Sequence, residues 1–224
     1  MKTVVLLMAL SLPVTFCCSA PKPEQLNTAI MKDKDIIHLV AQNDVQGVEA
    51  ALKSGANVNT TDNSKRSLLL MAVNSHQTEM ATLLIKYKAD VNQQADNADS
   101  PFLFAGASGQ TELVKLFLDN GARFDVFNRY NGTALIPACE RGHIETVRLL
   151  ANTKNFPVNH VNRLGWTGLM EAIVLGDGSK KYQEIVQILK DAGAKLDIPD
   201  HDGVTPLQHA QQKGFKEIAA ILKP

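Results

Sequence analysis

One motif recurs through most of this 224-residue chain, and its spacing limits the folds that are open to the sequence. A Ser or Thr is followed by an apolar stretch that ends in Ala five residues later. The copies begin at Ser67, Ser100, Thr133, Thr167 and Thr205. Units counted from five residues before each copy start at Asp62, Ala95, Asn128, Asn162 and Asp200, with spacings of 33, 33, 34 and 38. A period of this size indicates a stack of similar supersecondary units.

A second motif closes units one, two, three and five. It reads GANVN at 55–59, KADVN at 88–92, GARFD at 121–125 and GAKLD at 193–197. The diverged segment 29–61 ends in the first of these copies, so it counts as a unit as well. The repeat therefore predicts one domain over 29–224, with six units that start at 29, 62, 95, 128, 162 and 200.

These motifs resemble those of the ankyrin-repeat family over essentially all of the chain after residue 28. The fourth unit also carries Gly142-His143-Ile144-Glu145, which matches the family's Gly-His-x-Glu before a second helix. The later units are most similar to small stand-alone bacterial ankyrin proteins. The resemblance implies an all-α ankyrin-repeat solenoid of six helix-turn-helix units joined by β-hairpin-like turns. It brings no catalytic activity with it.

Elementary chemistry supports the same fold. We expect Ser67, Ser100, Thr133, Thr167 and Thr205 to cap the first helices by accepting backbone N–H bonds, each an effect of about 1 kcal/mol. Pro101 and Pro206 follow two of these caps, in the first turn, where a missing N–H costs nothing. The recurring Ala suits a position where neighbouring helices approach closely.

The fifth unit is longer than the others because of an insertion at 177–181, between its two expected helices. Its Gly and Lys residues superficially suggest a phosphate-binding loop. They lack the G-x-x-x-x-G-K-[ST] spacing and a preceding strand. We expect the insertion to form a solvated loop.

Composition excludes two broad classes of protein. Lys and Arg number 23 against 23 Asp and Glu, so the formal charge is zero, whereas a nucleic-acid binder usually shows a basic excess. Hydrophobic residues make up 45% and charged residues 21%, which is typical of a globular chain and excludes disorder. Aromatics are sparse at 5%, which suggests a core of small aliphatic side chains.

The N-terminus has the pattern of an export signal. Residues 1–20 combine Lys2, an apolar run and small residues at the end, and 21–28 read as a linker. The apolar run is too short for a comfortable membrane span, which needs about 20 residues. We therefore predict export to the periplasm or cell envelope.

Three fates of this segment remain open. Cleavage after Ser19 places small residues at the required positions, and it favours a soluble product. The second fate is a lipid anchor on Cys17 or Cys18, as in bacterial lipoproteins, although bulky Phe16 argues against it. The third is an uncleaved tether. Apart from such an anchor, we expect no membrane contact.

No residue pattern indicates catalysis, a metal or a cofactor. The six histidines form no paired ligand spacing such as H-x-H or H-E-x-x-H. Cys139 is the only cysteine after the signal, and no neighbouring base would activate it, so we interpret it as a small buried hydrophobe. We predict that the chain is not an enzyme.

Ankyrin proteins generally bind partners on the concave side, formed by hairpin tips and the outer faces of first helices. The residue types enriched at binding hot spots gather there in units four and five. The candidate binding residues are Arg129, Tyr130, Arg141, Arg163, Leu164, Trp166, His201 and Asp202. For Trp166 the alternative is packing against the neighbouring hairpin.

The sequence thus predicts a monomeric, non-catalytic adaptor that binds a protein partner in the envelope, and no nucleic acid. An alternative is an inhibitor or immunity-type protein that blocks an enzyme or toxin there. An enzyme is a third class, which a deep pocket with convergent polar groups would indicate.

Overall fold

The computed structural model describes residues 35–223 of the chain. The predicted signal peptide at 1–20, the linker at 21–28, both candidate lipidation sites and the start of the first unit at 29 lie outside the described residues.

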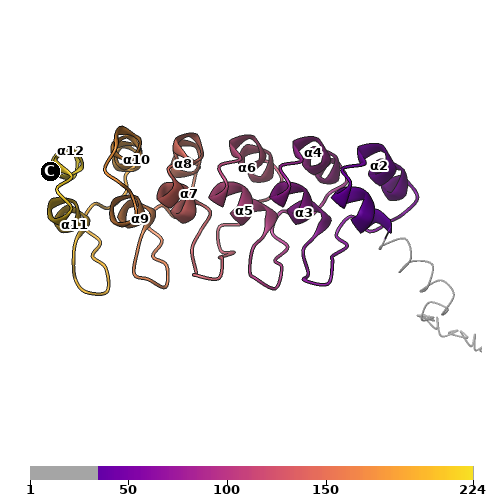
Figure 1. The fold of residues 1–224 in the computed structure, drawn as a ribbon, viewed down its shortest axis with the longest axis horizontal. Helices are drawn as coiled ribbons and strands as arrows, with labels where there is room; N and C mark the ends of the chain where they lie inside the picture. The colour runs from indigo at the N-terminus through magenta and orange to yellow at the C-terminus, as the bar shows by residue number, and fades with distance from the viewer. Residues whose placement is uncertain (1–34, 224) are drawn as a thin grey trace, which may run out of the picture.

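The described chain is a row of helix pairs that stack side by side (Figure 1). First helices, second helices and the connecting loops each form one layer of this row. Residues 35–41 are helical and form the first helix of unit one. The first helices of the other units form a middle layer: α3 Leu68–Asn74, α5 Pro101–Ala107, α7 Leu135–Arg141, α9 Gly168–Val174 and α11 Pro206–Gln212. The second helices form an outer layer: α2 Val45–Lys53, α4 Thr78–Lys86, α6 Thr111–Leu118, α8 Ile144–Ala151, α10 Lys180–Asp191 and α12 Lys216–Ile221. Long loops form the third layer, below the first helices in Figure 1.

Each loop turns back at a five-residue segment, which we call the hairpin tip. The tips are 62–66, 95–99, 128–132, 162–166 and 200–204. In every one, the first N–H donates to the last carbonyl, over 2.9–3.0 Å. The fourth tip residue has a positive φ each time, from 57° at Lys65 to 81° at Gly165. Within 35–223 the loops contain no β-strand, only one isolated bridge between Thr61 and Ser67.

The predicted helix caps are confirmed in four of five units. The hydroxyl groups of Ser67, Ser100, Thr167 and Thr205 each accept the N–H three residues ahead. The prediction for Thr133 is wrong. Helix α7 starts one residue later, at Leu135, and the buried Thr133 Oγ1 has no hydrogen-bond partner in the described structure.

Pro137 accounts for this exception. In the other four units, the N–H four residues after the cap closes the first turn on the cap carbonyl, as Met71 does on Ser67 over 2.9 Å. Pro137 occupies that position in unit four and has no N–H to donate. The first turn of α7 therefore lacks this closing bond, and the Thr133 hydroxyl accepts no N–H group of the helix.

Small residues let the helices stack closely. Ala72, Ala105, Ala138, Ala172 and Ala210 are all fully buried, as the repeat predicted. Gly106 of α5 also lies close to the next unit, where an added Cβ would be 2.7 Å from the Cβ of Ala134. Each pair of helices thus completes the core of its neighbour, because one unit alone cannot bury its own apolar face.

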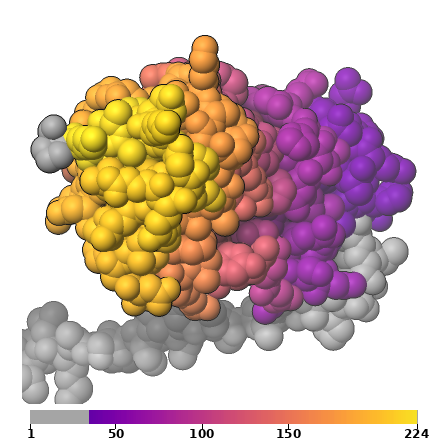
Figure 2. Space-filling model, turned by 60° about the vertical axis from the view of Figure 1, so that its left-hand side comes forward, coloured from indigo at the N-terminus to yellow at the C-terminus, as the bar shows by residue number. Residues whose placement is uncertain are grey.

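Unit six ends the stack with a polar surface. Helix α11 buries only Pro206 and Ala210, whereas α9 buries six of its seven residues. Figure 2 looks towards this end and shows the yellow unit covering the orange one behind it. The structure agrees with the expectation that a terminal unit carries a wetted outer face.

The insertion of unit five is only partly a loop. Lys180 and Lys181 form the first turn of α10, which at 12 residues is the longest helix described. The prediction of a solvated loop therefore holds for 177–179 but is wrong for these two lysines. Within 35–223, no helix is both long and apolar enough to span a lipid bilayer.

Candidate functional site

The tip of unit four is built by one asparagine. Asn128 Oδ1 accepts the N–H groups of Tyr130 and Gly132, both over 2.9 Å. Such side-chain bonds replace backbone partners that a five-residue turn cannot supply. Arg129 and Tyr130 therefore project from a defined turn, and the Arg129 guanidinium lies 5.0 Å from the centre of the Tyr130 ring.

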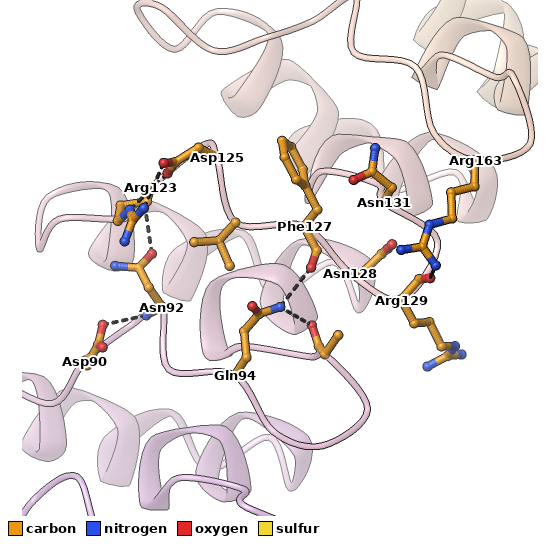
Figure 3. A pocket seen from close by; sticks show the side chains of 12 residues that line it. Asp90, Asn92, Gln94, Arg123, Asp125, Phe127, Asn128, Arg129, Asn131 and Arg163 are labelled. Carbon is orange, nitrogen blue, oxygen red and sulfur yellow. Dashed lines mark hydrogen bonds and ion pairs between the residues drawn. The ribbon is translucent and has the colours of Figure 1, made fainter.

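The tip of unit five repeats this construction and docks on the first. Asn162 Oδ1 accepts the N–H groups of Leu164 and Trp166, over 2.9 and 3.1 Å. Arg163 then makes two bonds to unit four. Its backbone N–H donates to the Tyr130 carbonyl over 2.9 Å. Its Nη1 donates to the Arg129 carbonyl over 3.1 Å (Figure 3). The two tips are thereby locked side by side.

The structural role of Asn128 and Asn162 was not predicted from the sequence. The sequence does carry a pattern that indicates this role, because an Asn or Asp begins four of the five tips. Asp62 and Asp200 make the same pair of bonds in units two and six.

Exposed apolar side chains concentrate on these two units. The large hydrophobic residues exposed in the described chain are Tyr130 at 50%, Leu175 at 49%, Leu164 at 46% and Val161 at 38%. Tyr130 and Leu164 occupy equivalent places on adjacent tips. Leu175 follows the C-terminal end of α9. Singly exposed hydrophobic residues are ordinary, but a cluster on adjacent repeats indicates a contact surface.

The arginines fall into two groups. Arg66, Arg123 and Arg148 each form an ion pair with a carboxylate, with closest distances of 2.6–2.7 Å. Arg129, Arg141 and Arg163 form none with any carboxylate in the described part of the chain. All three of these exposed arginines belong to the candidate site.

Two hollows meet at Arg129. On the concave side a hollow of about 140 Å³ combines two arginines with two carboxylates, and its lining includes Asp99, Arg129, Tyr130, Glu140 and Arg141, with Phe104 and Pro137 among its apolar walls. Figure 3 shows the second hollow, an open one of about 720 Å³, whose lining includes Arg123, Arg129 and Arg163 together with polar side chains such as Asn92 and Gln94. Arg141 is anchored to the concave side, since its Nη1 donates to the Ala107 carbonyl over 2.7 Å.

The remaining predicted residues lie farther along the tips. Trp166 is half-buried. His201 and Asp202 are exposed at the tip of unit six, where His201 lies directly against Gly165 of unit five. The structure thus brings Arg129, Tyr130 and Arg163 into contact. His201 adjoins them only through the unit-five tip.

Glu171 is a buried carboxyl group that the sequence did not single out for the site. It is 5% exposed and accepts a hydrogen bond from Asn162 Nδ2 over 2.8 Å. Burial, reinforced by the negative charge of Glu140, raises the pKa of Glu171 to about 7, while the Asn162 bond and Arg141 oppose the shift. It therefore links the tip of unit five to the first-helix layer.

Other reactive side chains have structural surroundings. Cys139 is fully buried, and burial raises its thiol pKa well above the ordinary value. His209 Nε2 lies 2.7 Å from Asp200 Oδ2, an interaction within unit six. Residues 35–223 contain no group of three His, Cys, Asp or Glu side chains placed to hold a metal ion.

Comparison with known proteins agrees with the repeat pattern. A family model described as ankyrin repeats in three copies matches residues 37–128 and 102–200. The ankyrin repeat protein YahD of Escherichia coli K12 is 37% identical over 189 residues, which is 84% of this chain and 94% of that protein.

Two crystal structures are similar as well. An ankyrin repeat domain from Acinetobacter baumannii AYE is 43% identical, with a TM-score of 0.81 over 84% of this chain and 95% of that one. The ankyrin repeat protein EF0377 is 38% identical, with a TM-score of 0.81 and the same coverage. With the family model covering more than half of its length, this chain belongs to the ankyrin-repeat family.

Proposed function

We propose that this chain is a non-catalytic adaptor that binds a protein partner through the hairpin tips and concave face of units four and five. Ankyrin repeats generally mediate protein–protein interaction. The observation that carries the proposal is the coincidence of exposed apolar residues with arginines that have no ion-pair partner in residues 35–223. Each of two adjacent tips combines one exposed apolar residue with one such arginine: Tyr130 with Arg129 in unit four, and Leu164 with Arg163 in unit five.

The surface is suited to binding because it is already ordered. Asn128 and Asn162 hold the two tips, and the Arg163 backbone joins them. A partner therefore does not have to order these loops, which removes part of the entropic cost of association. Tyr and Arg are also the residue types that contribute most at protein interfaces.

We further propose that the adaptor acts in the cell envelope, after export directed by residues 1–20. Mass spectrometry of the mature N-terminus in the native host tests this. A chain that starts at Ala20 supports soluble export, and an acylated Cys17 or Cys18 supports a lipid anchor. An intact Met1 on cytoplasmic protein would contradict both.

The binding proposal is tested by capturing a partner from envelope fractions with the purified chain and then measuring its affinity. Replacing Arg129, Tyr130 and Arg163 with Ala should weaken binding by about tenfold or more. Lys65→Ala with Arg66→Ala, at the tip of unit two, is the matched control and should leave the affinity unchanged. Circular dichroism verifies that both variants are folded.

Full affinity in the folded triple variant would contradict the proposal. The same experiment separates an adaptor from an inhibitor, because an enzyme partner that loses activity on binding identifies the chain as its inhibitor.

A further inference from the structure

The tips of units four and five each carry an exposed arginine that forms no ion pair with a carboxylate of residues 35–223. Arg129 begins an Arg-Tyr pair in unit four, and Arg163 begins an Arg-Leu pair at the equivalent place in unit five. The tip of unit two differs, because Lys65 forms an ion pair with Asp96 over 2.8 Å and Arg66 pairs with Asp62. Its cations are already neutralised within the chain.

Each of the two arginines keeps free donors. A guanidinium has five N–H groups. Arg163 donates one of its N–H groups to the Arg129 carbonyl, and this bond holds the Arg163 side chain against the tip of unit four. Arg129 lies over the Tyr130 ring. The remaining donors of both groups are available for carboxylates, with which arginine forms bidentate pairs.

An apolar residue follows each arginine at the same tip position. Tyr130 and Leu164 are about half exposed, at 50% and 46%. The two tips thus present a double row, with two guanidinium groups beside two apolar side chains. A partner that matches this row alternates carboxylates with apolar side chains.

We propose that the partner contributes an acidic segment, in which carboxylates pair with Arg129 and Arg163 while apolar side chains cover Tyr130 and Leu164. This inference rests on the proposed function and adds the chemistry of the partner. A nucleic acid fits less well, because these two tips of the described chain offer two arginines rather than a basic stripe, and the whole chain carries no net charge.

The test uses a short fluorescein-labelled peptide that alternates Glu with Leu and Phe, and a second peptide with Gln in place of every Glu. Fluorescence anisotropy with the full chain should give a Kd below about 1 mM for the acidic peptide. The Gln peptide should bind at least about tenfold more weakly. Raising the salt from about 50 to about 500 mM should weaken only the acidic peptide.

Matched variants locate the interaction. Arg129→Gln with Arg163→Gln should weaken the acidic peptide by about tenfold or more. Arg148→Gln is the control: this guanidinium is already paired with Glu184 on the second-helix layer, so the change should stay within about twofold. Both variants replace exposed arginines with a shorter, neutral and polar side chain, so their folds are expected to match that of the wild type.

Three outcomes would overturn the inference: no binding of the acidic peptide, equal binding of the Gln peptide, or tighter binding of a single-stranded oligonucleotide of similar length. The proposed function fails separately, when the captured protein partner keeps its affinity for the triple Ala variant. If the triple Ala variant no longer binds the captured partner but the wild type binds both peptides equally, these tips form the binding surface and the partner's segment is not acidic.

Discussion

Glu171 shows how a single position acquires different chemistry in successive repeats. The same place, four residues after the cap, holds Met71 in unit two and His209 in unit six. A carboxyl group there is removed from water and lies near the charge of Glu140, and both effects favour its protonated form. The pKa of about 7 follows from placing an ionisable residue at a position that the fold buries.

We predict that Glu171 makes stability depend on pH. Its folded-state pKa of about 7 lies above its ordinary value of 4.5, so protonation favours the folded state. This contribution is complete below about pH 4.5 and is lost as the pH rises to about 7. Glu171→Gln cannot ionise and can still accept the Asn162 bond. Its free energy of unfolding relative to wild type should therefore be higher at pH 8 than at pH 5.

Urea unfolding at the two pH values measures this difference. The exposed Glu112→Gln variant is the control, and its difference from wild type should be the same at both. A Glu171→Gln variant whose relative stability does not change with pH would show that the carboxyl group is ionised freely in the folded chain.

At the scale of the helix, α7 shows that a cap needs more than the right residue. Thr133 and Thr167 occupy the same motif position, and both are buried, at 2% and 3% exposure. Only Thr167 caps its helix, by accepting the Met170 N–H over 3.2 Å. Pro137 has no N–H group to close the first turn of α7 on the Thr133 carbonyl. The buried Thr133 hydroxyl has no hydrogen-bond partner in the described structure.

Replacing each threonine with valine should therefore change the free energy of unfolding differently. Thr167→Val removes a cap and should lower the free energy of unfolding by about 1 kcal/mol. Thr133→Val removes a buried, unsatisfied hydroxyl with little change of shape and should leave stability unchanged or raise it by up to about 1 kcal/mol. Chemical denaturation of both variants under one condition measures the contrast. Equal destabilisation would mean that Thr133 has a partner in solution.

For the whole molecule, stability resides in the contacts between neighbouring units. Gly106 of α5 lies at one tight junction, where an added Cβ would meet the Cβ of Ala134 at 2.7 Å and its carbonyl oxygen at 2.9 Å. It joins the first three units to the last three. In a linear array, one weak junction reduces the cooperativity between the two sides.

Gly106→Ala is thus predicted to destabilise the array, by about 1–3 kcal/mol. Helix propensity alone would predict a gain of up to about 1 kcal/mol, so the sign of the change distinguishes the two effects. Trp166, the single tryptophan, reports on unit five, while circular dichroism reports on all units. The two urea transitions should coincide in the wild type and separate in the variant.

A second substitution provides the control. Ala134→Gly in the Gly106→Ala background removes the Cβ contact and should recover part of the lost stability. A single variant that is more stable than the wild type, with coincident transitions, would contradict a tight junction at this place.

Much of the fold is readable from the sequence because its determinants are local. A Ser or Thr caps the N–H three residues ahead, and an Asn or Asp closes a five-residue tip, so a short stretch of chain contains both partners. The exception at Thr133 was also encoded locally, by Pro137 four residues further on. The period of the motif then implies the stack, because units of this size cannot bury their apolar faces alone.

The candidate site required the tertiary structure, because its properties depend on residues from different units. Whether an arginine is paired depends on partners such as Glu184, which is 36 residues from Arg148 but 2.6 Å away in space. Likewise, the pKa of Glu171 depends on Glu140 and Arg141 of the preceding unit.

The sequence by itself determined the family, the repeat and the starts of most helices, since these follow from contacts within one unit. Only the tertiary structure decided which charges are neutralised and which remain open for a partner, because that depends on how neighbouring units meet.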